Sequence, residues 1–178
     1  KRQVKTANKT TALGRNIEIT VKPYKNTKLY LGTNYGQNRV LVDSAILNEQ
    51  SIGYFKGKEK LTPGIYFVVS PKYSILFEFL MDDGQQFKIE ADTNTLAEFK
   101  VYGSTENDIF SAYSKKMNQL GMQKNQLEQG FASAKTATDS AYYIAQIKNI
   151  DSSFKAARQN ITTTAPNSMM RFFLDVLE

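Results

Sequence analysis

The sequence predicts an α+β fold, in which an antiparallel β-sandwich of about eight strands is followed by an α-helical hairpin and a third helix. Up to Tyr102, apolar residues recur at every second position in short runs, as in strands with one buried face. Turn residues separate these runs by roughly 8 to 12 residues, a spacing typical of a sandwich or barrel. After Gly103 the apolar spacing changes to three and four, which indicates helices.

The strands are predicted from this alternation and from the residues that interrupt it. Ile17, Ile19 and Val21 alternate with polar residues, and Pro23 ends the run. Further strands are expected at residues 28–35, 39–47, 51–57, 64–70, 75–81, 86–92 and 96–102. We expect a flexible basic leader at 1–14, the sandwich at 15–103 and a helical extension at 104–178.

Two features of these strands predict how they are arranged. The segment 75–81 is apolar on both faces, which predicts a central strand covered on both sides. Gly36-Gln37-Asn38 and Asp82-Asp83-Gly84 have the composition of hairpin turns. At the end of the sandwich, Ser104 or Thr105 can cap the first helix.

The helical part is predicted to be an antiparallel hairpin at 104–163. Two stretches of similar length each carry apolar residues three or four positions apart, which would form one stripe, or seam, along a helix. Lys124 interrupts the first seam. Gly130 and residues 133–138 mark the turn, and Asp139 can cap the second helix. The seams comprise Phe110, Tyr113, Met117, Leu120, Leu127 and Phe131, then Tyr143, Ile147, Ile150, Phe154, Ala157 and Ile161.

The third helix is expected at 167–178, with Asn167 or Ser168 as its N-cap. It is apolar around most of its circumference, so a neighbour should cover it. Phe172, Phe173 and Leu177 are the candidate partner-facing residues. We expect the natural chain to continue beyond residue 178.

Composition excludes several kinds of chemistry. The chain has no Cys and no His, which excludes thiol redox chemistry, zinc sites built on those residues and His general bases. We predict neither a catalytic residue nor a cofactor. The net charge of +6 is concentrated in residues 1–28, which hold eight basic side chains and one acid, so the folded body lacks the basic face of a nucleic-acid-binding protein.

Candidate ligand sites in the sequence have simpler structural explanations. A turn accounts for Asp82 and Asp83 without Ca²⁺. Thr95 replaces the Gly that a calcium loop beginning near Glu90 requires. Lys56, Lys58 and Lys60 alternate as on a solvated strand face. We therefore predict no metal site.

Several short segments occur in an order that resembles a known family. This is the uncharacterised β-sandwich domain with a helical extension that precedes thioredoxin-like and AhpC-TSA-type domains in cell-envelope proteins of Bacteroidetes. The segments are Val42-Asp43-Ser44-Ala45, Gly53 to Gly57, Pro63 to Tyr66, Gln86 to Ile89, Gly103-Ser104 with Asn107, Phe110 and Tyr113, and Pro166-Asn167-Ser168.

The resemblance implies a non-catalytic accessory domain of an exported thiol-disulfide oxidoreductase. Its partners would be a downstream thioredoxin-like domain of the same chain and that domain's protein substrates. Location in the periplasm or cell envelope is implied, with membrane attachment only through a removed anchor. Gly103, Ser104 and Asn107 would form the junction between sandwich and helices. The alternative is a self-sufficient β-sandwich that binds a glycan or peptide at the cell surface.

Overall fold

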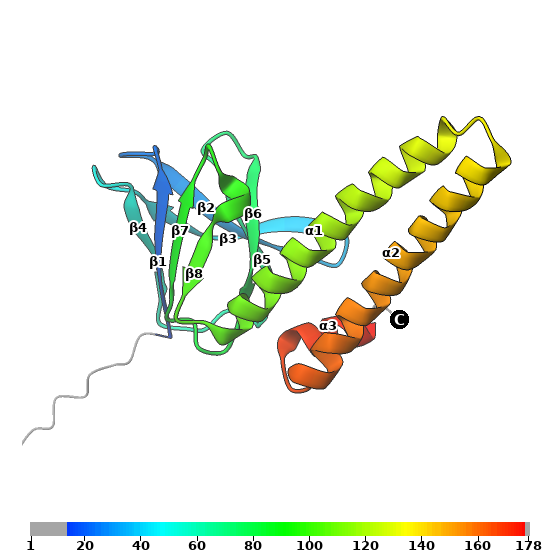
Figure 1. Ribbon diagram of the computed structural model, residues 1–178. Helices are drawn as coiled ribbons and strands as arrows, with labels where there is room; N and C mark the ends of the chain where they lie inside the picture. Colours follow the sequence, from blue (N-terminus) through cyan, green and yellow to red (C-terminus); the bar gives the residue numbers. More distant parts are fainter. Residues whose placement is uncertain (1–13, 177–178) are drawn as a thin grey trace, which may run out of the picture. The chain divides into compact units, whose positions relative to one another are not determined.

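The computed structural model describes residues 14–176 of the chain. Within these residues the fold contains two compact units, one ending at Ser104 and the other beginning at Thr105. The first unit contains the strands and the second contains the helices (Figure 1). Apart from Gly14, the predicted leader lies outside the described residues.

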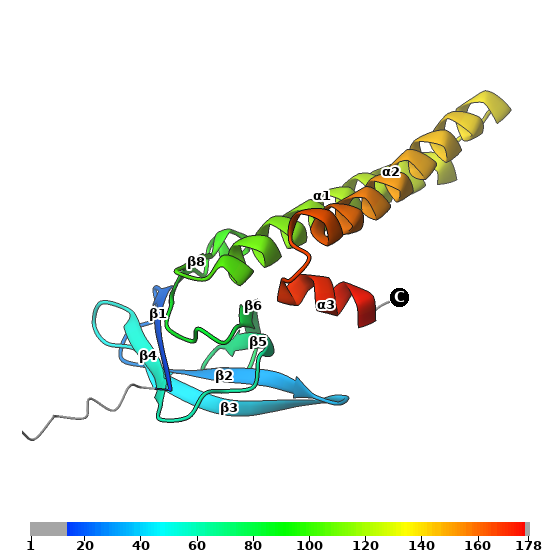
Figure 2. The same cartoon turned by 90° about the horizontal axis from the view of Figure 1, so that it is seen from below.

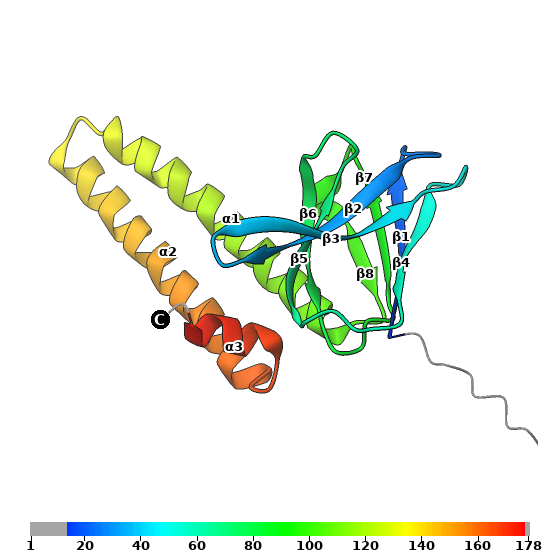
Figure 3. The ribbon, with the colours of Figure 1, turned by 180° about the vertical axis from the view of Figure 1, so that it is seen from behind.

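The first unit is a sandwich of two four-stranded sheets, as the sequence predicts (Figures 1 and 3). One sheet has the order β4-β1-β7-β8 and the other β3-β2-β5-β6. All strand pairs are antiparallel except β1 with β7. The strands are β1 (Arg15–Lys22), β2 (Lys28–Tyr35), β3 (Asn38–Ile46), β4 (Ile52–Gly57), β5 (Gly64–Val69), β6 (Ile75–Met81), β7 (Lys88–Asp92) and β8 (Lys100–Tyr102).

The core lies between the sheets and contains the apolar residues of the alternating runs. Ile17, Ile19 and Val21 of β1 are fully buried, as are Leu29 and Leu31 of β2. Aromatic rings also pack in this core, with the Phe79 ring 5.9 Å from that of Phe87 and 6.5 Å from that of Tyr66. The period-two pattern therefore identified the inward face correctly.

Three details of the predicted sheet are wrong. Strand β6 is an edge strand, although its pattern suggested a central one. The turn Asp82-Asp83-Gly84 does not close a hairpin, because it joins β6 of one sheet to β7 of the other. The last predicted strand begins as a 3-10 turn, η1 (Leu96–Glu98), and only Lys100–Tyr102 pairs with β7.

The second unit is the predicted hairpin with a short third helix (Figure 2). Its helices are α1 (Thr105–Ala132), α2 (Ala137–Thr164) and α3 (Met169–Val176). The predicted seam residues are half-buried or buried, except Phe131, which is 42% exposed. Thr136, not Asp139, is the N-cap of α2, since its hydroxyl accepts a hydrogen bond from the Asp139 amide at 3.0 Å.

Two residues that interrupt the helical pattern have structural explanations. The Lys124 ammonium lies 2.7 Å from the Asp151 carboxylate, so the charge within the α1 seam is paired with α2. Gly130 lies inside α1, not in the turn, and a Cβ there would come within 2.4 Å of the Tyr143 ring. The absence of a side chain at Gly130 therefore makes room for a seam residue of the opposite helix.

Candidate functional site

The outer face of the sheet β4-β1-β7-β8 carries a row of four polar side chains. The register aligns Tyr54, Glu18, Lys88 and Tyr102 across the four strands. The Tyr54 hydroxyl donates to the Glu18 carboxylate at 2.9 Å, and Lys88 lies 3.4 Å from Glu18 and 2.7 Å from Glu90.

The electrostatics of this row match its contacts. The hydrogen bond to Glu18 raises the pKa of Tyr54, the hydrogen bond to Glu90 raises the pKa of Lys88, and the hydrogen bond to Lys88 lowers the pKa of Glu90. Glu18 and Glu90 share the ammonium group of Lys88. The lowered pKa of Glu90 is the opposite of what a carboxylic acid held protonated for proton transfer requires.

Asp82 and Asp92, two of the acidic residues considered for metal binding, have partners in the protein. Asp82 Oδ1 accepts from the amides of Gly84 at 2.8 Å and Gln85 at 3.3 Å, and Oδ2 accepts from the Ser104 hydroxyl at 2.5 Å. Asp92 Oδ1 accepts from the backbone and side-chain nitrogens of Asn94 at 2.8 and 2.9 Å. Between Gly14 and Val176, no group of three or more Asp and Glu side chains is arranged to hold a metal ion.

The alternating lysines of the β4 region do not converge on one point. The Lys56 ammonium lies 4.0 Å from the centroid of the Tyr54 ring, and Lys60 donates to the Asp83 carbonyl at 2.6 Å. This arrangement is that of a solvated surface, without a common anion position.

The predicted junction residues occupy a constrained segment. Gly103 has a φ of +87°, a conformation that favours glycine. Ser104 is buried and bound to Asp82, which ties the end of the sandwich to the β6–β7 crossover. Asn107 is also buried, in the first turn of α1.

Sequence reasoning missed two side chains that organise the sandwich. Gln85 is fully buried and pairs with both backbone groups of Leu61, accepting at 2.8 Å and donating at 2.6 Å. The guanidinium of Arg15 donates to Asp43 at 2.8 and 3.1 Å and to the Glu59 carbonyl at 2.9 Å. The chain offered a weak sign of the second contact, because Asp43 stands within an otherwise apolar run.

The predicted partner-facing residues of α3 differ in exposure. Helix α3 begins at the predicted cap Ser168, whose hydroxyl accepts from the Arg171 amide at 3.2 Å, and the Met169 amide donates to Glu106 of α1 at 2.9 Å. Phe172 is 63% exposed, Phe173 is half-buried and Leu177 lies outside the described residues. Val176, which was not among the predicted partner-facing residues, is 85% exposed.

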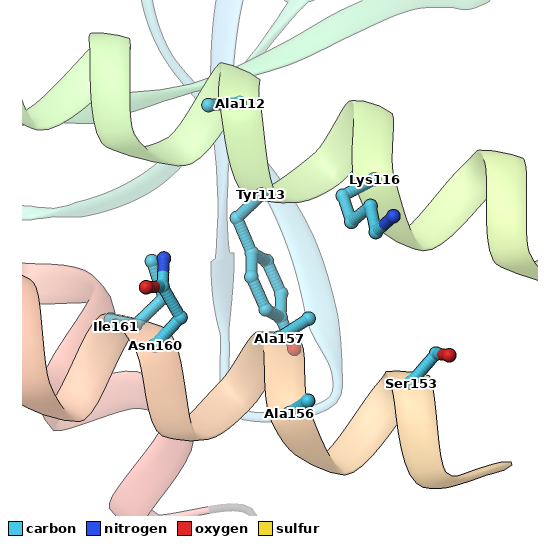
Figure 4. Close-up of a pocket in the computed structure, with 8 residues that line it drawn as sticks. All are labelled: Ala112, Tyr113, Lys116, Ser153, Ala156, Ala157, Asn160 and Ile161. Atoms are coloured by element: carbon cyan, nitrogen blue, oxygen red, sulfur yellow. The ribbon is translucent and has the colours of Figure 1, made fainter. Parts of the chain in front are cut away.

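A groove of about 460 Å³ lies between α1 and α2 (Figure 4). Tyr113 extends from α1 toward α2, and Lys116 is the only charged side chain among the lining residues. The groove is lined by Ala112, Tyr113, Lys116, Ser153, Ala156, Ala157, Asn160 and Ile161. The three alanines account for the gap, because small side chains leave space between the two helices.

Comparison with known families identifies the sandwich. Residues 16–110 match a domain of unknown function, DUF4369. The chain belongs to this family. The match covers more than half of the chain, from β1 to the first turns of α1, and so includes Gly103, Ser104 and Asn107. No curated protein and no solved structure matches the chain.

Among the described residues of this DUF4369 protein, none of the helices combines the length and the hydropathy of a membrane-spanning segment. The α1–α2 hairpin continues well beyond the matched region, which ends at residue 110. The family assignment therefore applies to the sandwich and the start of α1, while the rest of the helical unit must be interpreted from its own contacts.

Proposed function

We propose that this chain is a non-catalytic accessory region of an exported thiol-disulfide oxidoreductase, placed before a thioredoxin-like domain of the same polypeptide. It would act in the periplasm or cell envelope by holding the redox domain or its protein substrates. The match to DUF4369 supports the domain type, and the sequence resemblance described above is the basis for the thioredoxin context.

The exposed side of α3 is the observation that carries this proposal. Met170 and Leu174 are 4% and 5% exposed, so one face of the helix is packed. Phe172 and Val176 are 63% and 85% exposed, although both are large and apolar. Such residues on a short, otherwise anchored helix favour a further protein surface packed against it.

The first test is to sequence the coding DNA beyond codon 178. The reading frame is expected to continue and to encode a thioredoxin-like domain with a Cys-x-x-Cys pair. A stop codon shortly after codon 178 would refute the proposal.

If the frame continues, hydrogen exchange can test the role of α3 in the longer polypeptide. The amides of residues 169–176 should exchange more slowly there than in the 178-residue chain, because the added domain covers Phe172 and Val176. The variant Phe172→Ser should lose this protection, whereas Tyr142→Ser, a change at an exposed tyrosine of α2, should keep it. Equal exchange in the short and long chains would contradict the proposed contact.

A further inference from the structure

The loop between β5 and β6 holds an exposed tyrosine in a strained conformation. Tyr73 has a φ of +61° and is 68% exposed. Positive φ is rare for a bulky residue and usually persists only where the surrounding structure fixes it. Glycine or asparagine would adopt this positive φ with less strain.

The loop is held by hydrogen bonds around Ser70, which is itself buried. The Ser70 carbonyl accepts from the Tyr73 amide at 3.0 Å, and the Ser70 amide donates to the Ser74 carbonyl at 2.8 Å. The Ser70 hydroxyl accepts from the amides of Lys72 and Ser74 at 3.2 and 3.1 Å. Tyr73 is therefore presented by a preorganised turn.

The Tyr73 ring forms part of an aromatic pair. It stacks on the Tyr30 ring of β2 with centroids 5.2 Å apart and planes 19° apart, and the two hydroxyls are 3.4 Å apart. Tyr30 and Lys28 lie two residues apart on β2, on the face opposite to buried Leu29 and Leu31.

The surroundings of the pair are apolar and positively charged. Lys28 pairs with Ile46, which is 70% exposed, and Lys72 directly precedes Tyr73 and is exposed. The pKa of Tyr73 is raised by its hydrogen bond to Tyr30, and the charge of Lys28 opposes this rise. The patch thus combines a stacking surface with cationic groups.

We propose that Tyr73 and Tyr30, together with Lys28, form a binding site for an acidic sugar. The apolar C–H face of the sugar would stack on the Tyr73 ring, whose face carries partial negative charge. The sugar carboxylate would pair with Lys28, and the tyrosine hydroxyls would bind sugar hydroxyls. Single-stranded nucleic acid fits less well, because its binding relies on successive aromatic platforms along a basic groove, whereas this patch offers one exposed ring.

NMR titration of the 178-residue chain with trigalacturonate tests the site. Saturable shifts are expected for the amides of Tyr73, Tyr30 and Lys28, with smaller shifts when maltotriose, which is uncharged, is added. Lys28→Gln should weaken trigalacturonate binding by about fivefold. No saturable shift at these amides, or equal affinity for the two sugars, would overturn the proposal, as would tighter binding of a thymidine oligonucleotide.

The variant Tyr73→Gly tests the loss of binding without a loss of stability. Glycine adopts positive φ readily, so this variant should keep the thermal stability of the wild type while losing binding by at least about tenfold. Tyr73→Phe keeps the ring and serves as a second variant, with binding largely retained. Tyr35→Ala, at a 79% exposed tyrosine of the β2–β3 hairpin, is the matched control and should bind normally. Wild-type affinity in Tyr73→Gly would refute the assignment.

Discussion

The sandwich and the α1–α2 hairpin bury very different amounts of side chain. In the sandwich, residues of both sheets meet in one core, and Ile17, Leu31 and Phe79 have no exposed surface. In the 28-residue helices α1 and α2, Leu120 and Ile161 are the buried apolar residues. The other seam residues are half-buried or, for Phe131, exposed. The stability of the hairpin therefore depends on separate side-chain contacts along the line where the two helices meet, whereas that of the sandwich depends on one core shared by both sheets.

The largest expected effect is in the sandwich core. Phe79→Ala removes a fully buried ring between Tyr66 and Phe87 and should lower the free energy of unfolding by about 3 to 5 kcal/mol. Leu127→Ala, at a half-buried position of α1, should cost less than about 2 kcal/mol. Urea denaturation, followed by NMR signals of each unit, measures both changes. Equal losses would contradict the contrast between core and seam.

The next effect tests the close fit between α1 and α2. Gly130→Ala places a methyl group within 2.4 Å of the Tyr143 ring and should destabilise the hairpin by about 1 to 3 kcal/mol. Gly121→Ala is the matched control in the same helix, because a Cβ there meets nothing within 4 Å. The control should stabilise the helix by up to about 1 kcal/mol. Thermal unfolding monitored by circular dichroism should therefore give shifts of opposite sign, and shifts of the same sign would argue against the proposed packing.

Gly103→Ala, at the end of the sandwich, should lower the free energy of unfolding by about 1 to 2 kcal/mol through its effect on the backbone. Gly103 has a φ of +87°, and the nearest atom to an added Cβ is 3.9 Å away, so the loss would come from conformation and not from a clash. Gly103→Asn should cost less, since asparagine tolerates positive φ better. Denaturant titration of the wild type and the two variants measures the free energy of unfolding of each. A smaller loss for Gly103→Ala than for Gly103→Asn would exclude backbone conformation as the cause.

The smallest effect concerns the charged pair within the seam. The Asp151 carboxylate raises the pKa of Lys124 in the folded hairpin. The pair therefore stabilises the fold fully at pH values below the pKa of an unfolded lysine, about 10.4, and this stabilisation disappears as the pH rises through the pKa of Lys124 in the folded state. Lys124→Gln should be slightly less stable than wild type from neutral pH to about pH 10, and the difference should shrink above it. Lys115→Gln, at an exposed position of α1, is the control for general charge effects. A pH-independent difference would show that Lys124 acts through packing alone.

The alternation of apolar residues determined most of the architecture without tertiary information. It placed Ile17, Ile19 and Val21 on the buried face of the first strand, and the 3,4 spacing identified the seams of α1 and α2. Gly103 marked the end of the last strand, and the pair Asn167-Ser168 marked the start of α3, where Ser168 is the residue that caps the helix. These features depend on local geometry, because each period follows from how one strand or helix exposes its own side chains.

The tertiary structure decided which elements are neighbours and which polar groups meet. The Asp82-Asp83-Gly84 turn has hairpin composition but crosses between sheets, and β6 lies at an edge despite its apolar pattern. The pairs Arg15 with Asp43 and Lys124 with Asp151 join residues far apart in the chain. Periodicity cannot reveal such pairs, since it reports the environment of each residue but not the identity of its neighbour. The stacking of Tyr73 on Tyr30 has the same origin, because it requires the β5–β6 loop to fold over strand β2.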